Sequence, residues 1–219
     1  MLDLGKIRAI AFDLDDTLWP IWPTIERAEK ALQDWLGEHA PMTAALFASA
    51  GALREIRLEM SSSRPDLKHD MSALRRESIR LALYRAGEDP RLADAAFDAF
   101  FEARQQVTLF EDALPALEHL AQRYPLVSIS NGNADLRRIG LARLFRASIN
   151  AREFGVGKPD PRIFRKALEA LGGVEPSRAL FLDDYEGNVR AARGLGVHGI
   201  VVGPDPAPAL AEFDRLLGS

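Results

Sequence analysis

The sequence contains no cysteine among its 219 residues. This absence excludes disulfide bonds, thiolate nucleophiles and cysteine-ligated zinc, and it is typical of a reducing compartment. Histidine is scarce, and its positions do not have the spacing of metal ligands. The histidines are His39, His69, His119 and His198.

Excess basic charge and long apolar runs are also missing. The chain has 28 basic against 32 acidic residues, a net charge of −4, so no general field would attract a nucleic-acid backbone. No apolar run reaches the length of a membrane-spanning helix. An apolar fraction of 47% with 27% charged residues is ordinary for a globular protein. We expect a cytoplasmic protein with no nucleic-acid and no membrane partner; no oligomeric state is predicted.

Two common catalytic motifs are absent from the sequence. The segment FGVGKP superficially resembles a phosphate-binding P-loop, but Arg152 stands where the first glycine is needed and Pro159 replaces the serine or threonine. No serine lies in a G-x-S-x-G elbow. The sequence therefore predicts neither a P-loop nucleoside triphosphatase nor an α/β-hydrolase.

The most informative stretch is IRAIAFDLDDTLWP, residues 7–20. Its branched and aromatic residues predict a strand buried on both faces, which ends at Asp13, Asp15 and Asp16. Carboxylates crowded in this way repel one another unless a cation lies among them, and oxygen ligands suit Mg²⁺. A solvated acidic turn is the alternative.

A helical block follows, from residue 19 to residue 110. Trp22 and two prolines predict a stiff connection, and Thr24 is the expected N-cap of the first helix. Helical periodicity predicts the helices 24–40, 42–60, 70–86 and 90–106.

From residue 111 helices and strands alternate. The expected helices are 112–124, 133–145, 160–172 and 187–196, and the expected strands are 125–130, 147–150, 179–184 and 198–203. Such alternation predicts a doubly wound parallel α/β sheet with helices on both faces. The core would be 1–18 and 111–219, with the helical domain 19–110 inserted. In the tail, a short amphipathic helix is expected after the prolines, the last of which is Pro208.

Polar residues gather where these strands end. Open parallel sheets bind ligands at the carboxyl ends of their strands, so four segments are expected to converge on one site. They supply Asp13 and Asp15; Ser130, Asn131 and Gly132; Lys158; and Asp183 and Asp184.

The segments FDLDDTLWP, SISNGNAD, GKPDPRIF and FLDDYEGN resemble, in this order, the four motifs of the haloacid dehalogenase superfamily. The resemblance is to the branch whose α-helical cap is inserted after the first motif, and it covers nearly the whole chain. It implies a Mg²⁺-dependent phosphatase that acts on a small phosphate monoester through an aspartyl-phosphate.

The resemblance also implies residue roles. Asp13 would be the nucleophile, Asp15 the general acid and base, and Lys158 a fixed cation that offsets charge. Thr17, Ser130, Asn131, Gly132 and Lys158 would bind the substrate, with Thr17 and Asp16 also shaping the turn. The metal would be held by Asp13, Asp15, Asp184 and Asp183, where Asp183 is either a ligand or only the anchor of Lys158. Ser130 can equally be read as a strand end, and Lys158 as a solvated loop residue.

Several alternatives stay open. Dehalogenating members of the superfamily lack an Asp two residues after the nucleophile, so Asp15 favours transfer from phosphate esters. A phosphomutase, a receiver-like signalling domain with a phospho-acceptor Asp, and a silent binding protein are the other interpretations. Substrate choice would lie with the cap, although each basic side chain there has a solvated helix face as its alternative. The cap candidates are Trp19, Trp22, Arg54, Arg57, Lys68, His69 and Arg75.

Overall fold

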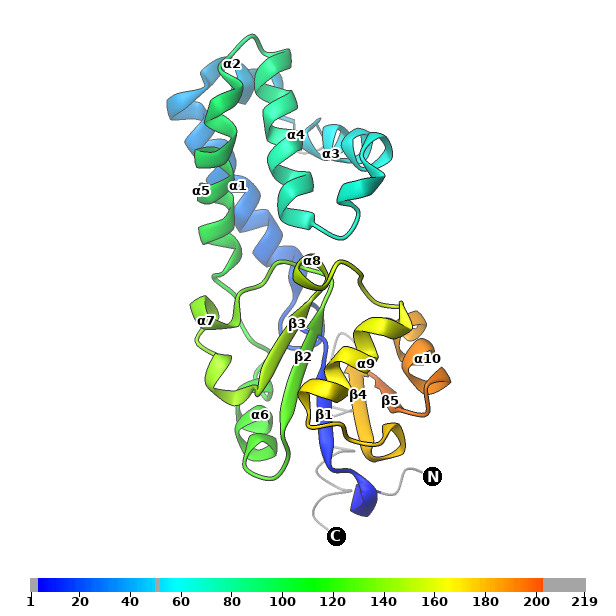
Figure 1. The fold of residues 1–219 in the computed structure, drawn as a ribbon. Coiled ribbons are helices and arrows are strands. Elements are labelled where there is room, and N and C mark those ends of the chain that lie inside the picture. The colour runs from blue at the N-terminus through cyan, green and yellow to red at the C-terminus, as the bar shows by residue number, and fades with distance from the viewer. Residues whose placement is uncertain (1–3, 50–51, 203–219) are drawn as a thin grey trace. The chain divides into compact units, whose positions relative to one another are not determined.

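The structure, a computed structural model, describes residues 4–49 and 52–202 (Figure 1). The chain forms two compact units, Met1–Ile21 with Val107–Ser219, and Trp22–Gln106. These bounds lie within four residues of those expected from the sequence. The expected C-terminal helix lies outside the described residues. Across 4–49 and 52–202, no helix combines the length and the apolar character needed to cross a bilayer.

The first unit contains a parallel sheet of five strands in the order β3-β2-β1-β4-β5. The strands are β1 (Ala9–Phe12), β2 (Leu126–Ser130), β3 (Ala147–Asn150), β4 (Ala179–Asp183) and β5 (His198–Val201). β1 is central, and Phe12 is in register with Ser128 of β2 and Leu182 of β4. All strands point the same way, so their carboxyl ends meet at one edge, as the sequence predicted.

Helices cover both faces of this sheet (Figure 1). Ile10 and Phe12 face the cluster that contains Leu117 of α6 (Ala113–Ala121). Ala9 and Ala11 face the opposite cluster, which contains residues of α9 (Pro161–Ala170) and α10 (Glu186–Gly194). Alternate side chains of β1 are therefore buried on opposite sides, and the doubly wound α/β prediction is confirmed.

One predicted helix of the core is largely wrong. Residues 133–145 contain only α7 (Leu136–Ile139) and the 3-10 turn Ala142–Leu144. Gly140 ends α7 with a φ of 89°, a left-handed conformation that glycine adopts without strain. A second short helix, α8 (Ala151–Phe154), was not predicted. The remaining short elements are the 3-10 turns Leu4–Lys6 and Pro176–Arg178.

The second unit contains helices and turns but no strand among its described residues. Its elements are α1 (Ile21–His39), α2 (Pro41–Leu46), α3 (Ala52–Ser63), Pro65–Leu67, α4 (Met71–Arg85), Pro90–Leu92 and α5 (Ala93–Arg104). Leu36, Leu83 and Phe100 are among the side chains buried at its centre. A helix interrupted after Leu46 replaces the single helix predicted over 42–60.

The start of α1 also differs from the prediction. The helix begins at Ile21, so Pro23 lies in its first turn, where the backbone N–H has no intrahelical partner to lose. Thr24 is a buried helical residue and not the N-cap. The expected stiff connection is the first turn of the helix.

Candidate active site

The turn after β1 is held by its own polar groups. The backbone N–H of Asp13 donates to the carbonyl of Leu182 at 2.8 Å, which fixes the strand end beside β4. Asp16 adopts a left-handed φ of 57°, which Asp tolerates better than most residues. Its Oδ1 accepts from the backbone N–H of Ile21 at 2.8 Å, so Asp16 ties the turn to the start of α1.

Lys158 joins two strand ends. Its Nζ donates to Oδ1 of Asp13 and to Oδ2 of Asp183, the latter at 2.7 Å. The lysine side chain is 2% exposed. The solvated-loop interpretation of Lys158 is therefore wrong, and its charge is fixed between two carboxylates.

The side chain of Asn131 holds the backbone of Lys158. Its Oδ1 accepts from the Lys158 N–H at 2.7 Å and its Nδ2 donates to the Lys158 carbonyl at 2.8 Å. A Cβ on Gly157 would lie 2.5 Å from this Oδ1, so only glycine permits the approach. Asn131, predicted to bind substrate, thus uses its amide to position the lysine.

Asp183 is fully engaged by protein donors. Besides Lys158, it accepts from the Tyr185 N–H at 2.9 Å and from Asn188 Nδ2 at 3.0 and 3.1 Å. The side chain is 0% exposed. These contacts favour the role of anchor for Lys158 over that of a direct metal ligand. Asn188, in the first turn of α10, was not among the predicted site residues.

Three carboxylates form a group that fits a divalent cation. Oxygen atoms of Asp13, Asp183 and Asp184 lie within 4.8 Å of one another. The donor set is entirely hard oxygen, which matches Mg²⁺. Lys158 neutralises one of the three charges and leaves room for a dication. The carboxylate of Asp15 is not in this group, so its predicted role as a metal ligand has no side-chain support here.

The pKa shifts agree with a site in which negative charges outnumber the single positive charge of Lys158. Burial raises the pKa of Asp13 to about 7, with a smaller lowering by Lys158 and a further increase from Asp183. Partial burial also raises the pKa of Asp184, and the charges of Asp183 and Asp16 add to this. Burial alone would lower the pKa of Lys158, but Asp13 and Asp183 raise it above its usual value. The acids are therefore costly to ionise without a cation.

Asp15 is oriented by a buried aromatic residue. Trp19 is 0% exposed, and its Nε1 donates to Oδ1 of Asp15 at 2.8 Å. Backbone pairing between the same two residues closes the turn. Trp19 was predicted to face the substrate, whereas in the structure it fixes the predicted general acid.

The predicted phosphate-binding groups behave differently from one another. Ser130 is buried, and its Oγ accepts from the Gly132 N–H at 2.9 Å, so this amide is already used within the protein. Thr17 is also buried, and its Oγ1 has no hydrogen-bond partner in the part of the chain that is described. A buried hydroxyl without a partner costs about 1–3 kcal/mol.

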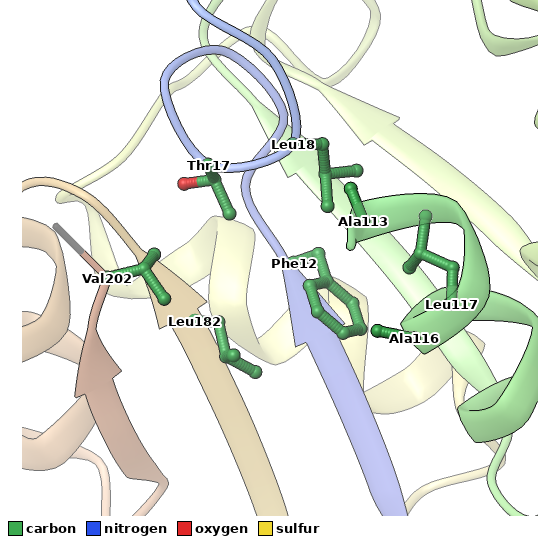
Figure 2. A pocket seen from close by; sticks show the side chains of 8 residues that line it. All are labelled: Phe12, Thr17, Leu18, Ala113, Ala116, Leu117, Leu182 and Val202. Carbon is green, nitrogen blue, oxygen red and sulfur yellow. The ribbon is translucent and has the colours of Figure 1, made fainter. Parts of the chain in front are cut away.

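Thr17 also lines a small apolar pocket beneath the turn (Figure 2). The pocket lies on the α6 side of the sheet, between Phe12, Leu18 and Leu117. Its other lining residues are Ala113, Ala116, Leu182 and Val202. Figure 2 shows the Thr17 hydroxyl turned away from Phe12 and Leu117. The lining offers no charged group for a phosphate, so this pocket belongs to the core and not to the acidic site.

Comparison with known proteins gives two kinds of relative. The family model of haloacid dehalogenase-like hydrolases matches residues 7–196. The 5-amino-6-(5-phospho-D-ribitylamino)uracil phosphatase YigB of Escherichia coli is 29% identical, over 98% of this chain and 91% of that protein. Phosphoserine phosphatase of Thermus thermophilus is 37% identical, over 58% of this chain and 54% of its own length.

A solved structure gives the second kind. The crystal structure of a 2-haloacid dehalogenase from Pseudomonas syringae pv. tomato is 36% identical, covers 97% of this chain and 98% of its own, and has a TM-score of 0.86. The relatives' names thus divide between phosphate ester hydrolysis and dehalogenation.

Proposed function

Because the chain belongs to the haloacid dehalogenase-like hydrolases, we propose that it is a Mg²⁺-dependent phosphatase acting on a small phosphate monoester through an aspartyl-phosphate on Asp13. The observation that carries the proposal is the group of three carboxylates around Lys158. Such an arrangement attracts a dication and a phosphoryl group together. The cytoplasmic location expected from the sequence stays a prediction.

The proposed reaction has two displacements. The carboxylate of Asp13 attacks phosphorus and the bond to the leaving oxygen breaks, while Asp15 gives its proton to that oxygen. Asp15 then removes a proton from water, whose oxygen attacks phosphorus and releases phosphate from Asp13. Lys158 offsets negative charge in both steps. The metal, held by Asp13 and Asp184 with Asp183 beside them, would supply further charge neutralisation when bound.

Removing Asp15 tests the type of reaction. For Asp15→Asn we expect kcat/KM, which reports the steps up to departure of the leaving group, to fall roughly 10²- to 10⁴-fold on alkyl phosphates, because a departing alkoxide needs the proton. The loss should be much smaller on p-nitrophenyl phosphate, whose leaving group is a stable anion. Trp19→Phe, which removes the orienting N–H together with part of a buried ring system, should give an intermediate loss. Equal losses on both esters would exclude Asp15 as the general acid.

Dehalogenation is the second candidate, favoured by the similar solved structure. A departing halide needs no proton, so that reaction would not use Asp15 as a general acid. We expect no chloride release from either enantiomer of 2-chloropropionate under conditions in which p-nitrophenyl phosphate is hydrolysed. Chloride release at a rate comparable to phosphate release would replace the proposal.

Metal dependence and its pH profile form a separate prediction. EDTA should stop hydrolysis and added Mg²⁺ should restore it. A proton on Asp13 competes with the metal, so the apparent Mg²⁺ affinity should fall by up to about tenfold for each pH unit below 7. Titrating tryptophan fluorescence with Mg²⁺ at pH 6 and pH 8 measures this. Hydrolysis that persists in EDTA would contradict the metal site.

A further inference from the structure

The helical unit contains a group of charges that does not balance. On α3 and α4, the Nη1 atoms of Arg57 and Arg75 both donate to the same oxygen, Oε1 of Glu29 on α1, at 3.2 and 3.4 Å. Elsewhere in this unit Arg85 has its own carboxylate, Glu59, which it contacts at 2.9 and 2.6 Å. At Glu29 two guanidinium groups share one acid.

This group is partly withdrawn from water. The side chain of Arg75 is only 11% exposed and that of Arg57 is 19% exposed. The guanidinium of Arg75 lies 3.7 Å above the centre of the Phe100 ring, so the ring holds its plane in place. Burial and the charge of Arg57 lower the pKa of Arg75 to about 9, against the opposing effect of Glu29. Positive charge in excess of its counterion is costly in such a place.

The group is nevertheless accessible to a small ion. Glu29 is 32% exposed, and Arg57 presents a planar fork of donors suited to a carboxylate or phosphate. Arg54 and Lys68, named with these arginines from the sequence, are exposed and have no comparable setting. The imbalance, the burial and the fixed guanidinium plane therefore coincide only at Arg57 and Arg75 among those basic candidates.

We propose that Arg57 and Arg75, with Glu29 as a weak internal competitor, form a binding site for a small anionic group, a carboxylate or a phosphate. The anion binds from solution within this unit, so the proposal does not depend on the proposed phosphatase activity.

The anion site is tested by thermal unfolding in sulfate. Sulfate should raise the unfolding midpoint of wild type more than that of Arg57→Gln, and Glu29→Gln, which removes the competing acid, should enhance the rise. Arg85→Gln, which breaks the balanced pair with Glu59, should show the same rise as wild type. This measurement needs no turnover, so it tests the anion site even if no phosphate ester is hydrolysed. Equal sulfate shifts in wild type and Arg57→Gln would overturn the proposal and leave the arginines as structural partners of Glu29.

Discussion

Replacing Asp13 with asparagine is expected to abolish turnover of phosphate monoesters while the chain keeps its fold. The amide has the same shape but cannot form the acyl phosphate, so kcat should fall at least roughly 10⁴-fold. Steady-state phosphate release and far-UV circular dichroism measure the two outcomes. Asp98→Asn on the exposed face of α5 is the matched control and should keep full activity.

The same substitution has a predictable effect on stability. The pKa of Asp13 is raised from 3.8 to about 7 in the folded protein. Without metal, its contribution to stability is present in full below about pH 4 and is lost as the pH rises through about 7. Asp13→Asn removes this loss, so at pH 8 in EDTA the variant should unfold at the same or a higher temperature than wild type. Normal turnover by the variant would contradict the nucleophile assignment.

Replacing Lys158 with methionine should have the second largest effect, on activity and stability together. The substitution leaves the carboxylates of Asp13 and Asp183 without the buried ammonium group that now joins them. Breaking a buried ion pair in this way costs about 3–5 kcal/mol. It should also raise the pKa of Asp13 further, because Lys158 now lowers it. Chemical denaturation with and without Mg²⁺ measures the loss, which the metal should partly reverse.

A double variant separates the charge effect from packing. If unpaired carboxylates cause the loss, Asp13→Asn should recover part of the stability lost in Lys158→Met, giving a coupling energy of at least about 0.5 kcal/mol. Lys166→Met, on the exposed face of α9, is the control and should change the stability little. Additive losses in the double variant would mean that the lysine contributes through packing alone.

The sheet was predictable because its strands are short apolar runs between clear turn signals. β1 is buried on both faces, so its sequence has no polar interruption before Asp13, and alternation fixed the parallel topology. The errors concern helix boundaries, where the local sequence pattern did not determine the backbone conformation. Residues 133–145 have helical periodicity, but Gly140 turns left-handed and the helix ends. Pro23 suggested a break, yet the first turn of α1 accommodates it because no hydrogen bond is lost there.

The site was predictable as a set of strand ends but not as a network of contacts. Asp13, Lys158 and Asp184 were expected together because parallel strands bring their carboxyl ends to one edge. The tasks of Asn131 and Asn188 were not visible. Asn131 acts on the backbone of a residue 27 positions away, and no periodic pattern encodes a contact between two loops. The sequence alone likewise suggested a substrate contact for the indole of Trp19. In the structure, its N–H donates a hydrogen bond to Asp15.

The central claim is that Asp13 carries the phosphoryl group during turnover. It is tested most directly by quenching the enzyme in acid during hydrolysis of a phosphate ester with Mg²⁺ and analysing its peptides by mass spectrometry. The account predicts one phosphoryl group on the peptide that contains Asp13, and none in Asp13→Asn or in EDTA. Rapid hydrolysis with the phosphoryl group on another residue, or with this peptide unmodified at every quench time, would contradict it.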